Sequence, residues 1–464
     1  MSRPSADRSA ARPPATVAAV TSPVTEHQPV RVVVVDADGA VPAVTAVRED
    51  GSRWAGAWLV VRCTGAPVAV VEAGFAGADA LPADAVCRLV EAAVAASPGR
   101  PPAPATPPAL PSASVVVPTN LARPEQLRAS VAALDALDHP DFEVVVVDNS
   151  RVGEADLLRE LVAGLSRVRV VREPVPGISA ARNAGVRSAR GEVVAFTDDD
   201  VQVDSGWLRA LATRFALRPD EDAVTGLILP AELETPAQLW FERHYGGFGA
   251  TRVFAPLTYR GAAGRNRLSR RAEVAVETWD GAEVRRFAVY GAGACGAGAN
   301  MAFRAGALQR VGPFDEALGT GTPARGGEDL AMFIRLLSSG GSIGYEPRAV
   351  VHHTHRADYP SLRSQIEAYG LGFTAMLTSL VGAQPWHLAG VLSQLPRVAR
   401  RVLSGEGDAG PAVPAEALLG APAPRELVRL ERRGALKGPA AYLRSRRDVR
   451  RRLAGALARG ARPA

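Results

Sequence analysis

The stretch Val193-Val194-Ala195-Phe196-Thr197-Asp198-Asp199-Asp200 decides the fold, because a short apolar strand runs directly into three carboxylates. Four consecutive apolar residues, 193–196, are typical of a strand buried in a sheet. In an open parallel sheet, the carboxyl ends of the strands open onto the ligand crevice. Asp198 and Asp200 would point the same way if the extended geometry continued, since side chains alternate with a period of two. Such a pair suits a hard divalent ion such as Mg²⁺ or Mn²⁺, and a solvated acidic turn is the alternative.

The segments around this stretch alternate between strand and helix patterns, which predicts an α/β fold with a Rossmann-like, mostly parallel sheet flanked by helices. We expect strands over 114–117, 142–147, 168–171, 193–197 and 223–229, and helices over 124–137, 155–165, 178–189 and 207–217. Polar residues recur where three of these strands end: Thr119 and Asn120, Asp148 and Asn149, and Asp198 to Asp200. This repetition predicts a ligand site at the carboxyl edge of the sheet. Residues 240–290 are less regular, and we expect a mobile loop region over that site.

Shifts in composition divide the chain into six segments. They are a disordered N-terminus (1–28), a small accessory α+β domain (29–97), a Pro-rich linker (98–112), the α/β domain (113–356), an apolar helical segment (357–403), and a linker with a basic helical tail (404–464). No catalytic constellation is visible in residues 29–97. The chemistry is therefore expected in the α/β domain.

The positive charge is concentrated at the C-terminal end of the chain. Residues 425–464 carry 13 basic and 3 acidic side chains, a balance of +10, which leaves −4 for residues 1–424 out of a total of +6. This distribution argues against a nucleic-acid groove in the body of the protein and for a tail attracted to acidic surfaces. Three widely spaced cysteines fit neither a disulfide framework nor a zinc site, and they favour a reducing cytosol.

One segment near the basic tail is long and uncharged. Residues 368–396 contain no Asp, Glu, Lys or Arg, and about 20 apolar residues are enough to cross a bilayer. Because Gln384-Pro385-Trp386-His387 interrupts the segment, we favour a packed helical hairpin or an interfacial helix over a span. Together with the arginines that follow, residues 361–464 suggest peripheral contact with the inner face of an anionic plasma membrane. A solvated basic tail is the alternative.

Seven short stretches carry a resemblance to a known family. They are 114–120 (SVVVPTN), 142–149 (FEVVVVDN), 177–185 (GISAARNAG), 193–200 (VVAFTDDD), 298–304 (GANMAFR), 311–315 (VGPFD) and 327–330 (GEDL). In their order and spacing, residues 113–356 resemble a family 2 glycosyltransferase with the GT-A fold. The resemblance covers about half of the chain. It implies a nucleotide-sugar donor, a divalent metal (Mn²⁺ or Mg²⁺) and a glycan or lipid-linked acceptor.

The resemblance also implies where the donor binds. Its base would lie near Pro118, Thr119 and the strand-end Asp148. Asp198 and Asp200 would fill the family's Asp-X-Asp motif and bind the metal on the donor diphosphate, with Asp199 in the same donor site.

Further positions follow from the same resemblance. Arg182 matches a basic position near the donor phosphates, and Asn300 is expected to contact donor or acceptor. Asp329, in the Glu-Asp pair, matches the catalytic base of inverting members. Either His353 or His355 matches a region that supplies a metal ligand or a phosphate contact in some relatives, and which of the three histidines at 352, 353 and 355 takes that role stays open.

The resulting hypothesis is an inverting, metal-dependent glycosyltransferase. It would move a sugar from a nucleoside-diphosphate donor, expected to be a UDP-sugar, to a hydroxyl in a cell-envelope or extracellular polysaccharide or a glycolipid. Two alternatives stay open: a nucleotidyltransferase, and a non-catalytic nucleotide- or carbohydrate-binding scaffold at the membrane. A nucleotidyltransferase would carry a glycine-rich basic loop after the first strand, where Pro118-Thr119-Asn120 stands instead.

Overall fold

The computed structural model describes residues 29–97, 106–107, 109–150, 155–248, 252–262, 272–394 and 425–458. The predicted disordered N-terminus and most of the predicted Pro-rich linker lie outside these ranges, as do residues 395–424 and 459–464.

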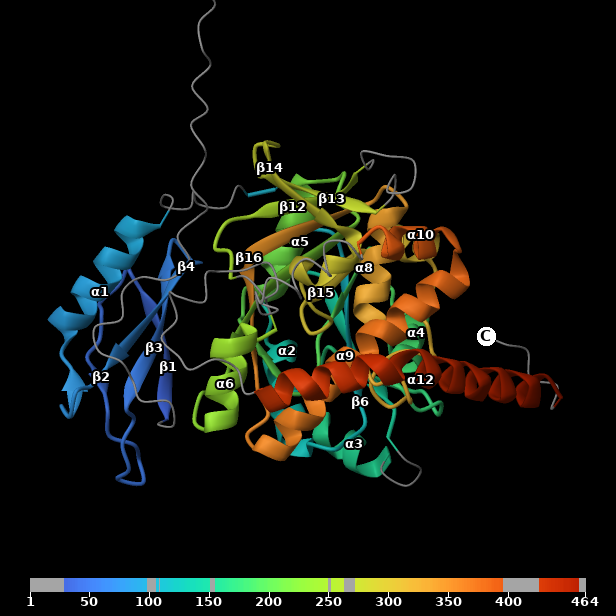
Figure 1. The fold of residues 1–464 in the computed structure, drawn as a ribbon. Coiled ribbons are helices and arrows are strands. Elements are labelled where there is room, and N and C mark those ends of the chain that lie inside the picture. The colour runs from blue at the N-terminus through green and yellow to red at the C-terminus, as the bar shows by residue number, and fades with distance from the viewer. Residues whose placement is uncertain are drawn as a thin grey trace, which may run out of the picture.

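Residues 29–97 form a small α+β unit, shown in blue in Figure 1. Its elements are β1 (Val30–Asp36), β2 (Val44–Thr45), β3 (Gly56–Cys63), β4 (Ala66–Gly74), β5 (Ala80–Leu81) and α1 (Ala83–Ala96). The three main strands form a sheet in the order β1-β3-β4, and β2 pairs with β5. Along β3, Leu59 and Val61 pack toward α1, whereas Trp58 and Val60 pack against the rest of the molecule. Both faces of this sheet are therefore buried, which explains the continuous apolar run in its central strand.

The remaining strands build one mixed sheet of 11 strands. They are β6 (Ala113–Thr119), β7 (Phe142–Asp148), β8 (Val168–Arg172), β9 (Val193–Phe196), β10 (Val201–Val203), β11 (Ala223–Pro230), β12 (Leu257–Ala262), β13 (Glu273–Thr278), β14 (Glu283–Ala288), β15 (Met301–Arg304) and β16 (Ser342–His353). Their order is β14-β13-β12-β16-β11-β15-β9-β6-β7-β8, with β10 paired to β16. Strands β9, β6, β7 and β8 are mutually parallel, and most pairs on the other side are antiparallel.

Helices cover both faces of the parallel half. They are α2 (Pro124–Asp135), α3 (Ala155–Leu161), α4 (Ile178–Ser188) and α5 (Trp207–Leu217), with α6 (Pro236–Tyr245), the 3-10 helix η1 (Val289–Cys295), α7 (Ala305–Val311) and α8 (Glu328–Ser338) further along. Val115 and Val117 of β6 share a core with α2, whereas Val116 between them shares a core with α4. This alternation confirms the predicted α/β class, with helices on a Rossmann-like sheet.

The predicted loop over residues 240–290 is wrong for much of its length. The segment begins inside α6 and contains the antiparallel strands β12, β13 and β14, while residues 249–251 and 263–271 lie outside the described structure. Charged residues interrupt the apolar runs of these strands: Glu273 and Glu277 flank the buried Val274 to Val276 in β13, and β14 has no buried residue. The segment therefore shows neither a continuous apolar run nor a clean alternation, and it resembles a polar loop.

The C-terminal extension is helical, with α9 (Tyr359–Ala383), α10 (Trp386–Leu392) and α12 (Arg425–Ala458). α12 lies along α9, and glycines let the two backbones approach: a Cβ on Gly370 would lie 2.0 Å from Glu431 O, and one on Gly434 2.1 Å from Glu367 O. In the part of the chain that the structure describes, α9 alone is long and apolar enough to cross a membrane, and 44% of its apolar window is buried.

Candidate active site

The polar strand ends meet at one edge of the sheet. Strands β6, β7 and β9 are parallel neighbours, so Thr119 and Asp148 are register partners and the acidic turn begins beside them. Thr119 Oγ1 donates a hydrogen bond of 2.7 Å to Asp199 Oδ2. Burial nevertheless raises the pKa of Asp199 to about 6. Asp199 therefore ties the acidic turn to the end of β6.

Asp198, Asp200 and His353 converge on one point, with one potential ligand atom each within 4.8 Å of the others. His353 Nε2 lies 3.6 Å from Asp200 Oδ1 and 4.0 Å from Asp198 Oδ2. The sheet brings the histidine to this place, because β10 follows directly after Asp200 and pairs with β16 so that Val201 is opposite His353. Two carboxylates and an imidazole are a donor set that divalent metals accept.

The tautomer of His353 suits a metal ligand. Its Nδ1 lies 2.9 Å from Thr354 O, and because a carbonyl oxygen only accepts, Nδ1 carries the hydrogen. Nε2 therefore turns its lone pair toward the two carboxylate oxygens. Burial lowers the pKa of His353 and outweighs the opposing effect of the two aspartates, which keeps the ring neutral. A histidine that donates its other nitrogen to a carbonyl is the usual metal-binding form, so these residues fit a divalent cation.

Two arginines bind the carboxylate oxygens that face away from His353. Arg123 Nη1 pairs with Asp200 Oδ2, and Arg182 Nη2 lies 3.3 Å from Asp198 Oδ1. At Asp200, burial opposes ionisation, but the nearby guanidinium groups of Arg123 and Arg356 outweigh it and lower the pKa. At Asp198, burial outweighs Arg182 and raises the pKa. One oxygen of each aspartate is thus left to face the histidine.

Arg182 links the acidic turn to the start of α8. It is 1% exposed, and its Nη1 donates to Glu328 Oε1 over 2.8 Å, so its guanidinium lies between Asp198 and Glu328. Burial opposes its charge, yet Glu328 and Asp198 raise its pKa above the ordinary value. Its Nη atoms therefore bind the protein's own carboxylates, which makes it a support for Asp198 in this structure.

Asp329 lies on the first turn of α8, beside this network. Its Oδ2 accepts a hydrogen bond of 2.8 Å from Gly298 N, whose own carbonyl accepts from Arg182 Nη2 over 3.3 Å. Gly298 belongs to the glycine-rich stretch 291–299, and a Cβ there would lie 2.7 Å from Arg182 Nη2. Only a glycine leaves room for this contact. The half-buried carboxylate of Asp329 is therefore joined to Asp198 through two short links.

The predicted nucleotide residues occupy the strand ends of β6 and β7. Pro118 and Thr119 are buried at the end of β6. Asp148 Oδ1 accepts from both Ser150 N and Ser150 Oγ, and it pairs with Arg172 Nη1 over 2.6 Å. Burial opposes its ionisation, but these bonds lower its pKa. The exposed Arg172 is thus held next to Asp148 at the edge.

Two predicted residues lie outside the cluster. Asn300 is fully buried, and its amide bonds Trp207 Nε1, Leu227 O and Ala349 O, so it belongs to the scaffold and we leave it out of the donor site. His355 Nε2 lies 2.7 Å from Glu242 Oε2, away from the two aspartates, so His353 takes the position beside them. The two histidines are only two positions apart in the sequence. The pairing of β16 with β10, which sets His353 opposite Val201, determines which of them lies beside the aspartates.

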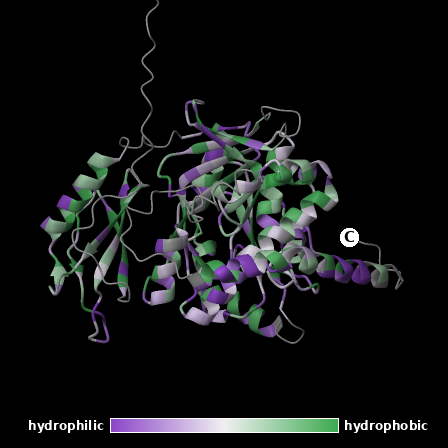
Figure 2. Ribbon diagram, viewed as in Figure 1, coloured by the Kyte–Doolittle hydropathy of each residue, from purple (hydrophilic) through white to green (hydrophobic). Residues whose placement is uncertain are grey.

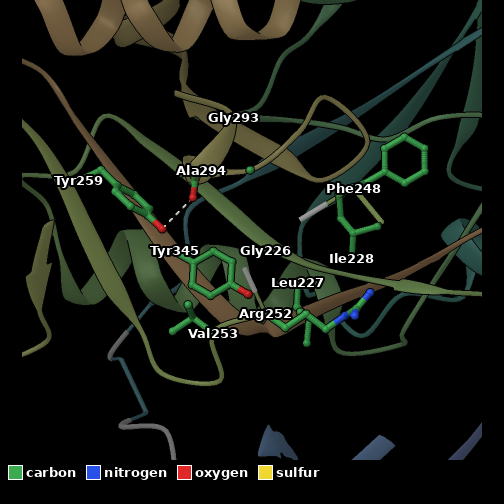
Figure 3. Close-up of a pocket in the computed structure, with 11 residues that line it drawn as sticks. Gly226, Leu227, Ile228, Phe248, Arg252, Val253, Tyr259, Gly293, Ala294 and Tyr345 are labelled. Carbon is green, nitrogen blue, oxygen red and sulfur yellow. Dashed lines mark hydrogen bonds between the residues drawn. The ribbon is translucent and has the colours of Figure 1, made fainter. Parts of the chain in front are cut away.

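A pocket lies on the antiparallel side of the sheet (Figure 3). Glycines and aromatic rings line it, together with Arg252; its lining includes Gly226, Phe248, Tyr259, Gly296 and Tyr345. Phe248 forms a wall shared with the metal cluster, because its ring stacks on His353 at a centroid distance of 4.1 Å. Tyr259 donates to Ala294 O over 3.0 Å and closes one side of the pocket.

Three residues of this site have no role predicted from the sequence. Arg123 follows β6, and an arginine there is the natural partner for acids that follow the parallel neighbour β9, so its position held a usable signal. Glu328 precedes Asp329 in a quoted motif, but its bond to Arg182 spans 146 residues. Phe248 lies in a segment without a clear pattern, and no feature of the sequence indicated that it stacks on His353.

Comparison with known proteins agrees with this geometry. Residues 114–308 match the model of glycosyl transferase family 2. The pre-mycofactocin glycosyltransferase of Mycobacterium tuberculosis is 26% identical over 252 residues, covering 53% of this chain and 43% of that protein. The glucosyl-dolichyl phosphate glucuronosyltransferase of Haloferax volcanii is 28% identical over 134 residues, covering 28% of this chain and 43% of that protein. The chain thus spans less than half the length of these curated relatives.

Among solved structures, a mannosyltransferase from Pyrobaculum calidifontis in complex with GDP-Man and Mn²⁺ aligns with a TM-score of 0.41 and 16% identity, covering 72% of this chain and 89% of that chain. The family match includes β6, the acidic turn after β9 and the strand β15 that precedes α7. The chain carries a glycosyltransferase domain of family 2.

Proposed function

We propose that this protein is an inverting, metal-dependent glycosyltransferase that transfers a sugar from a nucleoside-diphosphate donor, a UDP-sugar, to a hydroxyl group of a cell-envelope glycan or a glycolipid. The observation that carries the proposal is the convergence of Asp198, Asp200 and His353 at the sheet edge, in a domain of family 2. In this proposal residues 113–356 are the catalytic domain.

The donor side of the reaction uses the edge of the parallel strands. Asp198, Asp200 and His353 would hold Mn²⁺ or Mg²⁺, and the bound ion would neutralise the charge of the leaving diphosphate. Thr119 and Asp148 border the place for the nucleoside at the ends of β6 and β7. Arg182 keeps Asp198 in position from behind.

The acceptor side uses Asp329. A carboxylate within reach of the acceptor hydroxyl takes its proton as the oxygen attacks the anomeric carbon. In a single displacement the base lies opposite the leaving group, so the anomeric configuration inverts. The bond from Gly298 N fixes the Asp329 carboxylate while its second oxygen is held by Leu330 N, both over 2.8 Å.

A membrane location is part of the proposal. The exposed side of α12 carries basic residues along its length, visible as purple segments in Figure 2. They include Arg429, Arg432, Arg433, Lys437, Arg444, Arg447, Arg450 and Arg451. Cationic side chains near an anionic surface contribute about 1 kcal/mol each. We propose that the protein is cytoplasmic and binds the inner face of the plasma membrane through this helix, which suits a lipid-linked acceptor such as that named for the Haloferax relative.

The decisive experiment is a donor screen. The thermal stability of the protein is measured with UDP, GDP, TDP and CMP, each with and without Mn²⁺. Sugar conjugates of the nucleotide that stabilises the protein are then tested as donors, with release of the nucleotide as the readout. We expect a metal-dependent shift with UDP. A shift without turnover on any acceptor would support the scaffold alternative, and release of pyrophosphate from a nucleoside triphosphate and a sugar phosphate would support the nucleotidyltransferase. NMR of the product reports whether the anomeric configuration inverts.

A further inference from the structure

The N-terminal unit covers the face of the large sheet to which Val350 and His352 of β16 point. Trp58, Val60 and Val70 of β3 and β4 share one apolar cluster with Leu229 of β11 and Val350 of β16. Figure 1 shows this unit beside α6 and β16. The contact therefore falls on the strand whose last residue is His353.

One polar connection crosses this contact beneath the metal cluster. Arg62 at the end of β3 pairs with Asp204 Oδ2, and Asp204 Oδ1 lies 3.4 Å from His352 Nε2. His352 and His353 are adjacent in a strand, so their side chains point to opposite faces. Asp204 directly follows β10, the strand that leads away from Asp200. The connection thus joins the residue before His353 to a residue four positions after Asp200, on the opposite face of the two strands.

A second connection runs around the other flank of His353. The guanidinium of Arg252 lies 5.6 Å from the ring centroid of Trp58 and pairs with Glu242. The other oxygen of Glu242 is bound to His355 Nε2. His353 therefore lies between two histidines that are each held by a carboxylate. Asp204 holds His352 and is paired with Arg62 of the N-terminal unit. Glu242 holds His355 and is paired with Arg252, which lies against Trp58 of that unit.

The same unit also fixes α6, which carries Glu242. Glu72 of β4 pairs with Arg243, and both side chains are 10% exposed. Arg48 pairs with Glu234 over 2.6 Å just before the helix, and Val30 N donates to Leu233 O over 2.8 Å. The helix is held before its first turn and near its last.

We propose that residues 29–97 act as a clamp that positions His353 toward Asp198 and Asp200, with Arg62 and Trp58 as its positioning residues. The inference rests on the metal centre of the proposed function. Groups bonded directly to a metal ligand typically set metal affinity by about 10- to 100-fold, and we expect the lower end of that range because Arg62 and Asp204 act through the neighbouring His352. The clamp gives the accessory unit a role in the chemistry although it contributes no atom to the site.

The test measures Mn²⁺ affinity by calorimetry and hydrogen exchange of the segments 198–206 and 350–356 in the full chain. Arg62→Ala and Asp204→Asn are each expected to weaken Mn²⁺ binding by about tenfold or more and to speed exchange in both segments. Because the two side chains form one connection, the double variant should be little worse than either single variant. Arg53→Ala is the matched control, since it breaks an exposed pair with Asp79 inside the same unit.

Each outcome decides the question. Unchanged affinity and exchange in Arg62→Ala and Asp204→Asn would overturn the clamp, as would equal effects in Arg53→Ala. Asp204→Asn is isosteric and leaves the N-terminal unit intact. If Arg62→Ala fails to fold, the result for Asp204→Asn therefore decides the question. If the wild-type protein binds no Mn²⁺, the metal centre of the proposed function fails, and faster exchange at 350–356 in the variants still supports the clamp.

Discussion

At Asp198 and Asp200, the two oxygens of each carboxylate face different partners. One oxygen is bound by an arginine, and the other faces the lone pair of His353 Nε2. This division orients the free oxygens without leaving either side chain to rotate. It also concentrates negative potential at a single point, where a cation would relieve the repulsion between the acceptors.

Asp200→Asn should remove a metal ligand while keeping the shape of the side chain. We expect Mn²⁺ affinity to fall by about 100-fold, since an amide oxygen carries no charge and the bond to Arg123 is weakened as well. Calorimetric titration with Mn²⁺ measures the change. Asp199→Asn is the control, because Asp199 is bonded to Thr119 and lies outside the cluster. Equal losses in both variants would contradict the assigned ligands.

The Glu328 side chain should make stability depend on pH. Burial and the neighbouring Asp329 raise its pKa from an ordinary 4.5 to about 7. Between these values the folded protein holds a proton that the unfolded chain releases, so this group lowers the free energy of unfolding as pH rises through that window. Glu328→Gln removes this contribution, and urea unfolding at pH 5 and pH 7.5 should show a smaller decrease than the wild type. An unchanged decrease would count against the shifted pKa.

At the scale of elements, α8 begins in a confined place. Gly327 has a φ of +86°, and a Cβ there would lie 2.6 Å from Gly372 O of α9. The next two residues are Glu328 and Asp329, so the start of this helix and the proposed base are positioned by a backbone contact between two helices. No side chain fits between them.

Gly327→Ala should therefore reduce both stability and turnover. The left-handed backbone costs about 1–2 kcal/mol for a residue with a Cβ, and the contact with Gly372 O adds to it. Gly340→Ala isolates the first effect, because Gly340 has a φ of +88° with nothing within 4 Å of its Cβ position. Chemical unfolding and steady-state rates compare the two. If both variants lose the same stability and activity, the contact with α9 is unimportant.

The elements that could be predicted from the sequence are those in which the pattern of apolar residues reflects how they are buried. Strands such as Val193–Phe196 are apolar throughout because both faces of the parallel sheet are covered, and the acids after them mark the edge. The hairpin strands β12 to β14 were missed because their buried runs are only three residues long, or absent in β14, and charged residues lie next to them. The choice between His353 and His355 depends on a strand pairing that spans more than 150 residues, which no local pattern reveals.

At the scale of the whole molecule, α12 places a row of arginines on the outside of the catalytic body. Tyr442 of this helix donates to Asp315 Oδ2 over 3.0 Å, and Ser379 of α9 binds the same oxygen. The basic helix is thereby fixed to the 311–315 turn of the α/β domain. A surface that attracts α12 would hold the catalytic domain in a defined orientation.

Replacing Arg444, Arg447, Arg450 and Arg451 by Gln should weaken binding to vesicles that contain anionic lipid. At about 1 kcal/mol for each cation, the loss is roughly two to three powers of ten in the partition coefficient at low salt. Vesicle sedimentation measures it, and wild-type binding should also weaken as salt rises. The matched control replaces Arg53, Arg88, Arg128 and Arg159, four exposed arginines of other ion pairs. Equal losses would show that net charge alone matters.

The position of β16 in the sheet determines the order in which the residues of the metal cluster come together during folding. This strand comes last in the sequence of the sheet, yet it pairs with β10, β11 and β12, which were all synthesised earlier. Contacts between distant residues form late because closing the long loop between them costs entropy. His353 is the final residue of that strand. A chain still leaving the ribosome thus holds both aspartates long before their histidine arrives, so it completes the centre only when the whole sheet is closed.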